Sequence, residues 1–396
     1  MSPKVFSLTC VGITLLLFGV VGLFNAIVDP FGYFRVVEID GFNLLKPKAP
    51  GNERLVKAAL VAKIKPEAVI VGNSFAEIGL PPLHPGFTRN GLLKSFNLGV
   101  QGAEWSEVYC LAMFALRQPQ MKRLVVGVSG VDSSPCPTDD ELGRADYSKL
   151  LFSRTALDAS FDTLRQQHGS RAMTREGVWS FVRNDSRLQT DDEVIGNFAL
   201  WFRGALCPSV DIPSRPMDLA RISKDAPAPE QVAGLRQLIR LALAKKVELV
   251  LLFYPTHVLF NESGRRCDGP EEHWNYLWPA VALADKEAGG ETEQVQIWDF
   301  FGYGPLNTER LHAGKPMRGR LWQDFGHFNE EVGSAAFDAI FSGDTHYGAR
   351  VTVGIFDQLV ARTEKERQAF LDGNEWVVPE LNELVQRARA MPIREH

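Results

Sequence analysis

The sequence contains few cysteines and no recognisable metal-binding pattern. Its 396 residues include five cysteines, which lie far apart and form no C-x-x-C pair: Cys10, Cys110, Cys136, Cys207 and Cys267. This spacing argues against a zinc module and against a small scaffold held by disulfides. The sequence also lacks H-E-x-x-H, and His257 and His273 stand apart from other candidate ligands. We therefore expect no metal site.

An excess of positive charge and nucleotide-binding loops are also missing. Lys and Arg total 43 against 48 Asp and Glu, a formal net charge of −5, which argues against a nucleic-acid partner. No G-x-G-x-x-G or Walker loop follows an expected strand, so no nucleotide cofactor is expected. Hydrophobic residues make up 45% of the chain and charged residues 23%, which is typical of a folded globular protein.

One apolar run is long enough to cross a membrane. Residues 5–28 contain no charged residue, and at about 1.5 Å per residue a helix of this length reaches roughly 36 Å. The alternative, a cleaved signal peptide, requires a shorter apolar core and an A-x-A-like exit, which this segment lacks. We predict an uncleaved transmembrane anchor after a short tail at 1–4. Basic residues lie on both sides of the anchor, so the charge rule leaves its orientation open.

From residue 65 onward, short apolar runs alternate with helical patterns. Strands are expected at 67–72, 96–99, 123–128, 247–254 and 294–298, and helices at 104–117, 231–246 and 331–341. Continuous apolar strands that alternate with helices indicate an α/β fold, with a parallel sheet covered on both faces. Ligands bind such sheets beyond the carboxyl ends of the strands. The residues that follow each strand are therefore the candidate site.

The rest of the chain divides by composition. Residues 29–64 are interpreted as a juxtamembrane linker, 65–343 as the α/β domain and 344–396 as a C-terminal extension. Within the domain, residues 139–228 are polar, rich in Arg and Asp, and poor in strand-like runs. We interpret them as a mostly helical insertion that is positioned to cap the ligand crevice.

Three segments carry possible catalytic groups: two follow expected strands, and the third precedes the expected helix at 331–341. Ser74 lies at a strand-to-helix turn, where a hydroxyl is exposed beside backbone N–H groups that can hold an oxyanion; an ordinary helix cap is the alternative. Gly102 lies in a glycine-containing loop after the second strand, where the backbone can approach a ligand. Asp324 and His327 are spaced so that the carboxylate can orient the imidazole as a general base. The combination, more than any single pattern, predicts a catalytic serine, histidine and aspartate at one sheet edge.

In these segments the sequence resembles the SGNH (GDSL-like) hydrolase superfamily. It is most similar to the membrane-anchored bacterial members linked to acylation of cell-surface polymers. The resemblance is carried by NAIVDPFG at 25–32, VGNS at 71–74, NLGVQGA at 97–103, FYPTH at 253–257, WDFFGY at 298–303 and DFGH at 324–327. It implies a three-layer flavodoxin-like fold that lies outside the bacterial cytoplasmic membrane, on the periplasmic side.

The resemblance also implies a role for each site residue. Ser74 is the implied nucleophile, His327 its base and Asp324 the residue that orients His327. The implied oxyanion donors are the backbone N–H groups of Ser74 and Gly102. The sequence departs from the family pattern twice: it has Asn73 where the family usually has Asp, and Asp132 near the position of the family's oxyanion Asn. Asn97 and Asn73 are the candidates to complete the oxyanion hole.

These observations and the resemblance predict a serine-dependent esterase or O-acyltransferase of acetyl type, acting on an extracytoplasmic cell-surface glycan or polymer without a cofactor. A membrane-bound acyltransferase is the expected acyl donor. The alternative is a weakly active or inactive glycan-binding or assembly component of a polysaccharide acylation or export system. Its candidate sugar-stacking residues are Trp105, Trp201, Trp274 and Trp278. A lipase-like enzyme is a further alternative, although no long acyl groove is visible in the sequence.

Outside the cytoplasm the four cysteines after Cys10 can form disulfides, in a pairing that their spacing does not determine.

Overall fold

The structure is a computed structural model that describes most of the chain. The described residues are 2–131, 148–166, 173–178, 191–204 (backbone alone for 201–204), 215–225, 227–289, 293–312, 314, 320–343 and 346–391. Asp132, Cys136, Cys207 and the side chain of Trp201 lie outside this part. The chain forms two compact units, Met1–Lys65 with Thr138–Val182, and Pro66–Pro137 with Arg183–His396. The predicted insertion at 139–228 is therefore divided between the two units.

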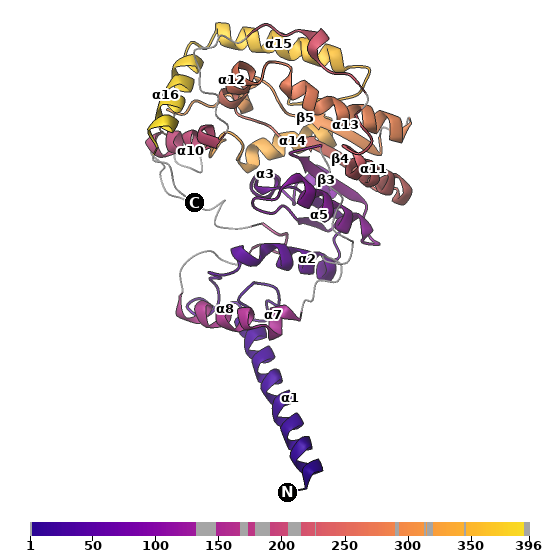
Figure 1. Cartoon of the computed structure of the whole chain (residues 1–396), viewed down its shortest axis with the longest axis vertical. Helices are drawn as coiled ribbons and strands as arrows, with labels where there is room; N and C mark the ends of the chain where they lie inside the picture. Colours follow the sequence, from indigo (N-terminus) through magenta and orange to yellow (C-terminus); the bar gives the residue numbers. More distant parts are fainter. Residues whose placement is uncertain are drawn as a thin grey trace. The chain divides into compact units, whose positions relative to one another are not determined.

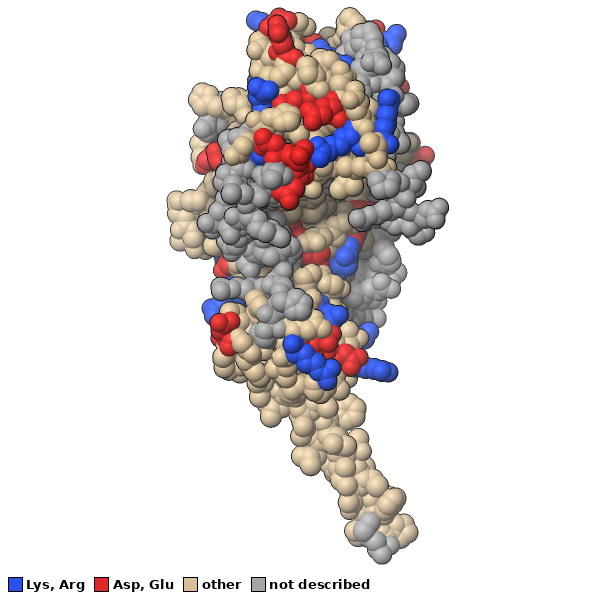
Figure 2. Space-filling model, turned by 90° about the vertical axis from the view of Figure 1, so that its left-hand side faces the viewer, with Lys and Arg blue, Asp and Glu red and all other residues tan. Residues whose placement is uncertain are grey.

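The first unit begins with the apolar helix α1 (Pro3–Val28). This helix is long and apolar enough to cross a membrane. Large apolar side chains along it, from Val5 to Leu23, are exposed, and α1 carries no charged side chain on the face that Figure 2 shows. The structure thus contains the helix that the predicted anchor requires.

The carboxyl end of α1 packs inside the first unit. It contacts α7 (Lys149–Phe152) and α8 (Arg154–Arg165). Asn25 is fully buried there, donates to the Leu151 carbonyl (2.6 Å) and accepts from the Ser160 hydroxyl (2.7 Å). The segment predicted as a linker contributes a further helix, α2 (Glu53–Ile64).

The second unit is built on a six-stranded mixed sheet (Figure 1). Its strands are β1 (Ala68–Val71), β2 (Ser95–Asn97), β3 (Arg123–Val128), β4 (Glu248–Phe253), β5 (Val295–Asp299) and β6 (Ala349–Arg350). Their order across the sheet is β2-β1-β3-β4-β5-β6. The first five strands run parallel, and each corresponds to a strand expected from the sequence. The α/β class is therefore confirmed.

The sixth strand corrects the expectation of an all-parallel sheet. β6 pairs antiparallel with β5, with Trp298 opposite Arg350 and Asp299 opposite Ala349. An antiparallel edge strand on an otherwise parallel sheet is common. Two residues are too few to produce a hydrophobic pattern, which explains why the sequence did not reveal this strand.

Helices pack against both faces of the sheet. Successive β1 residues are all buried although their side chains point to opposite faces. Ala68 and Ile70 belong to a core that includes residues of α3 (Ser74–Gly79) and α14 (Glu330–Ser342). On the other face, α11 (Ala233–Lys245) contacts both α5 (Trp105–Arg117) and α13 (Glu272–Ala288).

The remaining helices extend the core around α14. They are α4 (Pro85–Thr88), α10 (Asp191–Gly204), α12 (Val258–Cys267), α15 (Phe356–Asp372) and α16 (Val377–Ala390). α16 lies beside α10 (Figure 1) and contacts both α10 and α12. The predicted C-terminal extension therefore forms part of the second unit.

Candidate functional site

Ser74 occupies the turn at the carboxyl end of β1. It is the first residue of α3, and the residue before it, Asn73, provides the helix cap by accepting the Phe75 backbone N–H (3.0 Å). The cap is thus supplied by Asn73, and the Ser74 hydroxyl has a different partner. The alternative interpretation, that Ser74 is itself the N-cap of the helix, is therefore wrong.

Asp324 and His327 lie in a tight loop that backbone hydrogen bonds close. Trp322 and Phe328 form an antiparallel bridge, and the Gln323 N–H donates to the His327 carbonyl (2.8 Å). Phe328 is fully buried against α3, where a Cβ on Gly79 would lie 2.1 Å from the Phe328 ring. Because glycine permits this close approach, the loop is held against the helix that begins with Ser74.

The three side chains form a continuous hydrogen-bonded chain. The distance from Ser74 Oγ to His327 Nε2 is 2.8 Å, and the distance from His327 Nδ1 to Asp324 Oδ2 is 2.6 Å. Asp324 Oδ1 accepts the backbone N–H groups of Gly326 (2.9 Å) and His327 (2.8 Å). The structure therefore brings together the serine, histidine and aspartate that the sequence predicted, from positions 253 residues apart.

The environment of Asp324 fixes the direction of these hydrogen bonds. Burial alone would raise the pKa of this carboxyl, but the hydrogen bond and charge of His327 and the two backbone N–H groups lower it below its ordinary value of 3.8. Asp324 is therefore ionised at neutral pH and only accepts hydrogen bonds. His327 Nδ1 must then donate to it, which leaves Nε2 to accept the Ser74 hydroxyl hydrogen.

Two aromatic residues that the sequence did not single out support this chain. The Phe75 ring meets the His327 ring edge-on, with centroids 4.8 Å apart, and meets the Tyr254 ring in the same way at 5.4 Å. Tyr254 is buried, and burial raises the pKa of its hydroxyl. The imidazole is thus held by packing as well as by Asp324.

The loop after β2 supplies the second predicted oxyanion donor. Pairing of this segment with the β1 segment continues beyond the strands, because Leu98 N–H donates to Ile70 O (2.7 Å) and Val100 N–H to Gly72 O (3.0 Å). Gly102 follows with φ +65°. Among the described residues, no group accepts the backbone N–H of Ser74 or Gly102.

Asn97 does not fit the tentative oxyanion role. Its side chain is fully buried and donates to the carbonyls of Ala76 (2.9 Å) and Leu80 (3.0 Å), while Oδ1 accepts the Gly99 N–H (2.9 Å). Both amide hydrogens are therefore used to hold α3 against β2, and none remains for a ligand. Asp132, near the position of the family's oxyanion Asn, lies outside the described residues.

His257 is a positioning residue that the sequence did not assign. It is fully buried at the start of α12, where its Nε2 contacts the Glu309 carbonyl (2.6 Å) and its backbone N–H donates to the Phe325 carbonyl (3.0 Å). The second bond ties α12 to the loop that carries Asp324. Burial lowers the pKa of His257 to about 4, although the Glu309 carbonyl partly offsets this effect.

This pKa predicts a pH-dependent stability. The pKa of His257 is 6.5 in the unfolded chain, the ordinary histidine value, and about 4 in the folded chain. Between these two pH values the unfolded chain binds a proton at His257 and the folded chain does not. The contribution of His257 to the free energy of unfolding is therefore complete above pH 6.5 and should fall by on the order of 3 kcal/mol as the pH drops to 4. Urea unfolding at several pH values measures this slope. His257→Asn should lose most of it, whereas the same change at the partly exposed His312 should retain it. Equal slopes in both variants would contradict the prediction.

A pocket adjoins the site beyond the carboxyl ends of β3, β4 and β5. Its volume is about 340 Å³, and Phe75 forms part of its wall. Its other lining residues are Val128, Ser129, Phe253, Tyr254, Thr256, Phe260, Asn261, Gly264, Arg265, Asp268, Gly269, Pro270, Glu272, His273, Tyr276 and Phe301.

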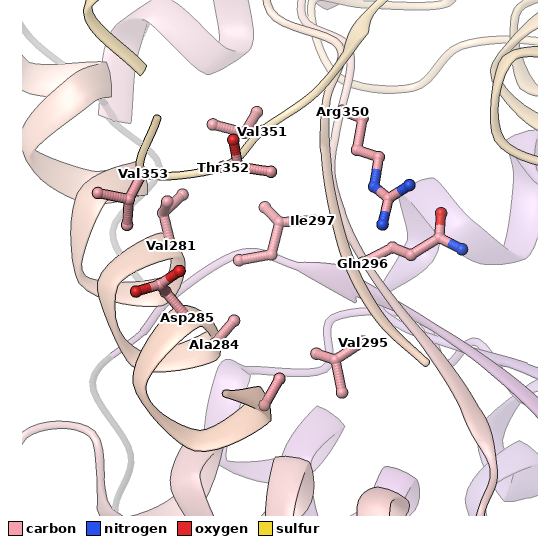
Figure 3. A pocket seen from close by; sticks show the side chains of 11 residues that line it. Val281, Ala284, Asp285, Val295, Gln296, Ile297, Arg350, Val351, Thr352 and Val353 are labelled. Atoms are coloured by element: carbon pink, nitrogen blue, oxygen red, sulfur yellow. The ribbon is translucent and has the colours of Figure 1, made fainter. Parts of the chain in front are cut away.

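A much smaller pocket of about 30 Å³ lies between α13, β5 and the β6 segment, lined largely by apolar side chains such as Val281 and Ile297 (Figure 3). Its volume is about that of one water molecule in the liquid.

Comparison with known proteins does not assign the chain to a family. No family model, curated protein or solved structure matches this chain.

Within the described residues, no group of three or more His, Cys, Asp or Glu side chains is arranged to hold a metal ion. Cys110 and Cys267 are each disulfide-bonded, and Cys10 is free.

Proposed function

We propose that the second unit is an acyl-transfer enzyme of the SGNH type, in which Ser74 is the nucleophile, His327 the general base and acid, and Asp324 the residue that orients His327. The observation that carries this proposal is the hydrogen-bonded chain from Ser74 Oγ through His327 to the ionised Asp324. A purely structural or sugar-binding domain has no need for a serine hydroxyl aligned on an imidazole whose other nitrogen is bound by a carboxylate.

The geometry supports a two-step reaction. Ser74 Oγ attacks the carbonyl carbon of an acyl ester while its proton passes to His327 Nε2, and the carbonyl oxygen becomes an oxyanion facing the Ser74 and Gly102 N–H groups. The intermediate collapses to a Ser74 acyl ester, and His327 returns the proton to the departing alcohol. An acceptor hydroxyl then gives its proton to His327 and takes the acyl group, and His327 passes that proton to the departing Ser74 Oγ, which restores the free enzyme. Water as the acceptor makes the enzyme an esterase, and a sugar hydroxyl makes it an O-acyltransferase.

The fold agrees with this proposal. The strand order of the first five strands, β2-β1-β3-β4-β5, is the order of flavodoxin-like sheets, in which ligands bind at the carboxyl edge where the strand order reverses. Ser74 follows β1 and the Gly102 loop follows β2, so both candidate oxyanion donors lie at that edge. The proposed fold family is therefore the three-layer flavodoxin-like one.

We also propose that the chain is anchored in a bacterial inner membrane by α1, with the second unit on the periplasmic side. The disulfides of Cys110 and Cys267 support an oxidising compartment, because such bonds are rare in the cytosol. An extracytoplasmic glycan is the proposed acceptor, and a membrane-bound acyltransferase is the proposed source of the acyl group.

The test is turnover of a chromogenic acetyl ester by the full chain in detergent micelles. We expect release of the chromophore, with acetate as product in water and an acetylated sugar when a soluble glycan is added. A folded protein that releases chromophore no faster than the detergent blank would contradict the proposal. Release that the glycan accelerates, with acetate formation falling, identifies a transferase.

A further inference from the structure

The pocket beyond β3, β4 and β5 combines apolar rings with hydrogen-bonding groups that have no partner. Its aromatic side chains are Phe75, Phe253, Tyr254, Phe260, Tyr276 and Phe301. The Tyr276 hydroxyl is buried and has no hydrogen-bond partner. A buried hydroxyl without a partner is costly, so a ligand that hydrogen-bonds to it would be favoured.

A second polar group in the wall is held in a fixed orientation. His273 Nε2 lies 2.9 Å from Asp299 Oδ2, and the imidazole stacks on the Phe301 ring with centroids 4.0 Å apart. In the part of the chain that the structure describes, His273 Nδ1 has no hydrogen-bond partner. The wall thus presents two hydrogen-bonding side chains, Tyr276 and His273, next to aromatic faces.

Several other polar side chains of the pocket are already engaged. Thr256 donates to Asn261 Oδ1 (2.5 Å), and the Asn261 amide donates to Gly302 O (3.1 Å). The charge of Arg265 is balanced by Glu364, to which it donates two hydrogen bonds (3.0 and 2.7 Å). Asp268 and Glu272 also line the pocket. This arrangement disfavours an anionic ligand, because the remaining formal charges among the described lining residues are negative.

Size and polarity together indicate the class of ligand. A volume of about 340 Å³ holds roughly eleven groups the size of a water molecule, enough for one sugar ring or one medium-length acyl chain. An acyl chain that fills the pocket would leave the Tyr276 hydroxyl without a partner, at an energetic cost. A sugar ring satisfies that hydroxyl with one of its own and places its C–H faces against aromatic rings.

We propose that this pocket binds a neutral sugar ring of the acceptor glycan, with Tyr276 Oη and His273 Nδ1 hydrogen-bonded to ring hydroxyls. This inference rests on the proposed function for its placement in the reaction. Phe75 directly follows Ser74 and forms part of the pocket wall, so a ring bound in the pocket lies near the nucleophile and the rest of the glycan reaches the acyl-enzyme. The assignment makes Tyr276 and His273 specificity residues for the acceptor and leaves acylation of Ser74 to the catalytic residues.

The test is saturation-transfer NMR on the full chain in a detergent without a sugar headgroup. The probes are the methyl glycosides of glucose, mannose and galactose, with octanamide as an uncharged acyl-chain probe. We expect at least one glycoside to bind and octanamide not to bind. Tyr276→Phe, which removes only a hydroxyl, should weaken that binding roughly 3- to 10-fold. Tyr347→Phe is the matched control, because Tyr347 also has a buried hydroxyl but does not line the pocket; it should bind like the wild type.

Three results would overturn the assignment: no glycoside binds, octanamide binds and its binding is lost in Phe260→Ala, or a glycoside binds equally well to wild type, Tyr276→Phe and His273→Asn. Labelling of Ser74 by a fluorophosphonate is measured separately on the same samples. Labelling without sugar binding rejects the pocket assignment alone. Sugar binding without labelling rejects the acyl-transfer chemistry alone.

Discussion

Ser74→Ala should abolish acyl-ester turnover while the protein stays folded. The substitution removes the atom that forms the acyl-enzyme, and His327 is then left without a nucleophile to activate. In enzymes with this constellation, loss of the nucleophile lowers kcat by roughly 10⁴-fold or more. We expect acetyl-ester turnover by Ser74→Ala to fall to the level of the detergent blank. The assay is chromophore release by the full chain in detergent micelles.

The control for this variant is a serine in a comparable setting. Ser334 is also a half-buried helical serine, in α14, so Ser334→Ala repeats the chemical change away from the Ser74–His327 chain. Its kcat should equal that of the wild type. Because Ser74 is half-buried and does not cap α3, both variants should unfold at wild-type urea concentrations. Turnover by Ser74→Ala within tenfold of wild type would reject the assigned nucleophile.

Asp324→Asn should lower kcat by roughly 10³- to 10⁴-fold. The reason lies in the backbone around Asp324. Its Oδ1 accepts the N–H groups of Gly326 and His327, and an asparagine oxygen will keep that position. The amide NH₂ then faces His327 Nδ1 and donates to it, so the imidazole carries its hydrogen on Nε2. In that tautomer His327 cannot accept the Ser74 proton.

This prediction separates a catalytic role from a structural one. The substitution is nearly isosteric, so the urea midpoint near neutral pH should change far less than the rate. The matched control is Asp357→Asn, because Asp357 is exposed and pairs only with Lys224 among the described residues (2.5 Å). It should leave kcat unchanged. A fall in kcat of less than tenfold for Asp324→Asn would show that Asp324 does not set the tautomer of His327.

The sequence predicted the five parallel strands because each is a continuous apolar run. β3 (Arg123–Val128), for example, is buried at every position, as expected of a strand covered on both faces. The Ser74 turn and the loop with Asp324 and His327 were also predicted, since the first follows a predicted strand and the second precedes a predicted helix. What brings them together, the packing of Phe328 against Gly79, depends on contacts far apart in sequence and leaves no local pattern.

Other parts of the site could not be predicted for the same reason. Asn97 was a reasonable oxyanion candidate by position, but its amide hydrogens are used by the backbone of α3. His257 carried no distinguishing spacing, and its role follows from a backbone bond to Phe325. The pocket that we assign to a sugar ring is formed by residues from position 75 to position 301. Such a surface is a property of the folded sheet and its helices.

The most direct test of the account is covalent labelling of Ser74. The full chain in detergent micelles is treated with a fluorophosphonate, digested and mapped by mass spectrometry, beside Ser74→Ala and His327→Ala. We predict a single adduct on the peptide that contains Ser74 in the wild type and none in Ser74→Ala. In His327→Ala the labelling rate should fall by roughly a hundredfold or more, because the general base is lost. A folded wild-type protein that remains unlabelled, or that is labelled on another serine, would contradict the proposed catalytic centre.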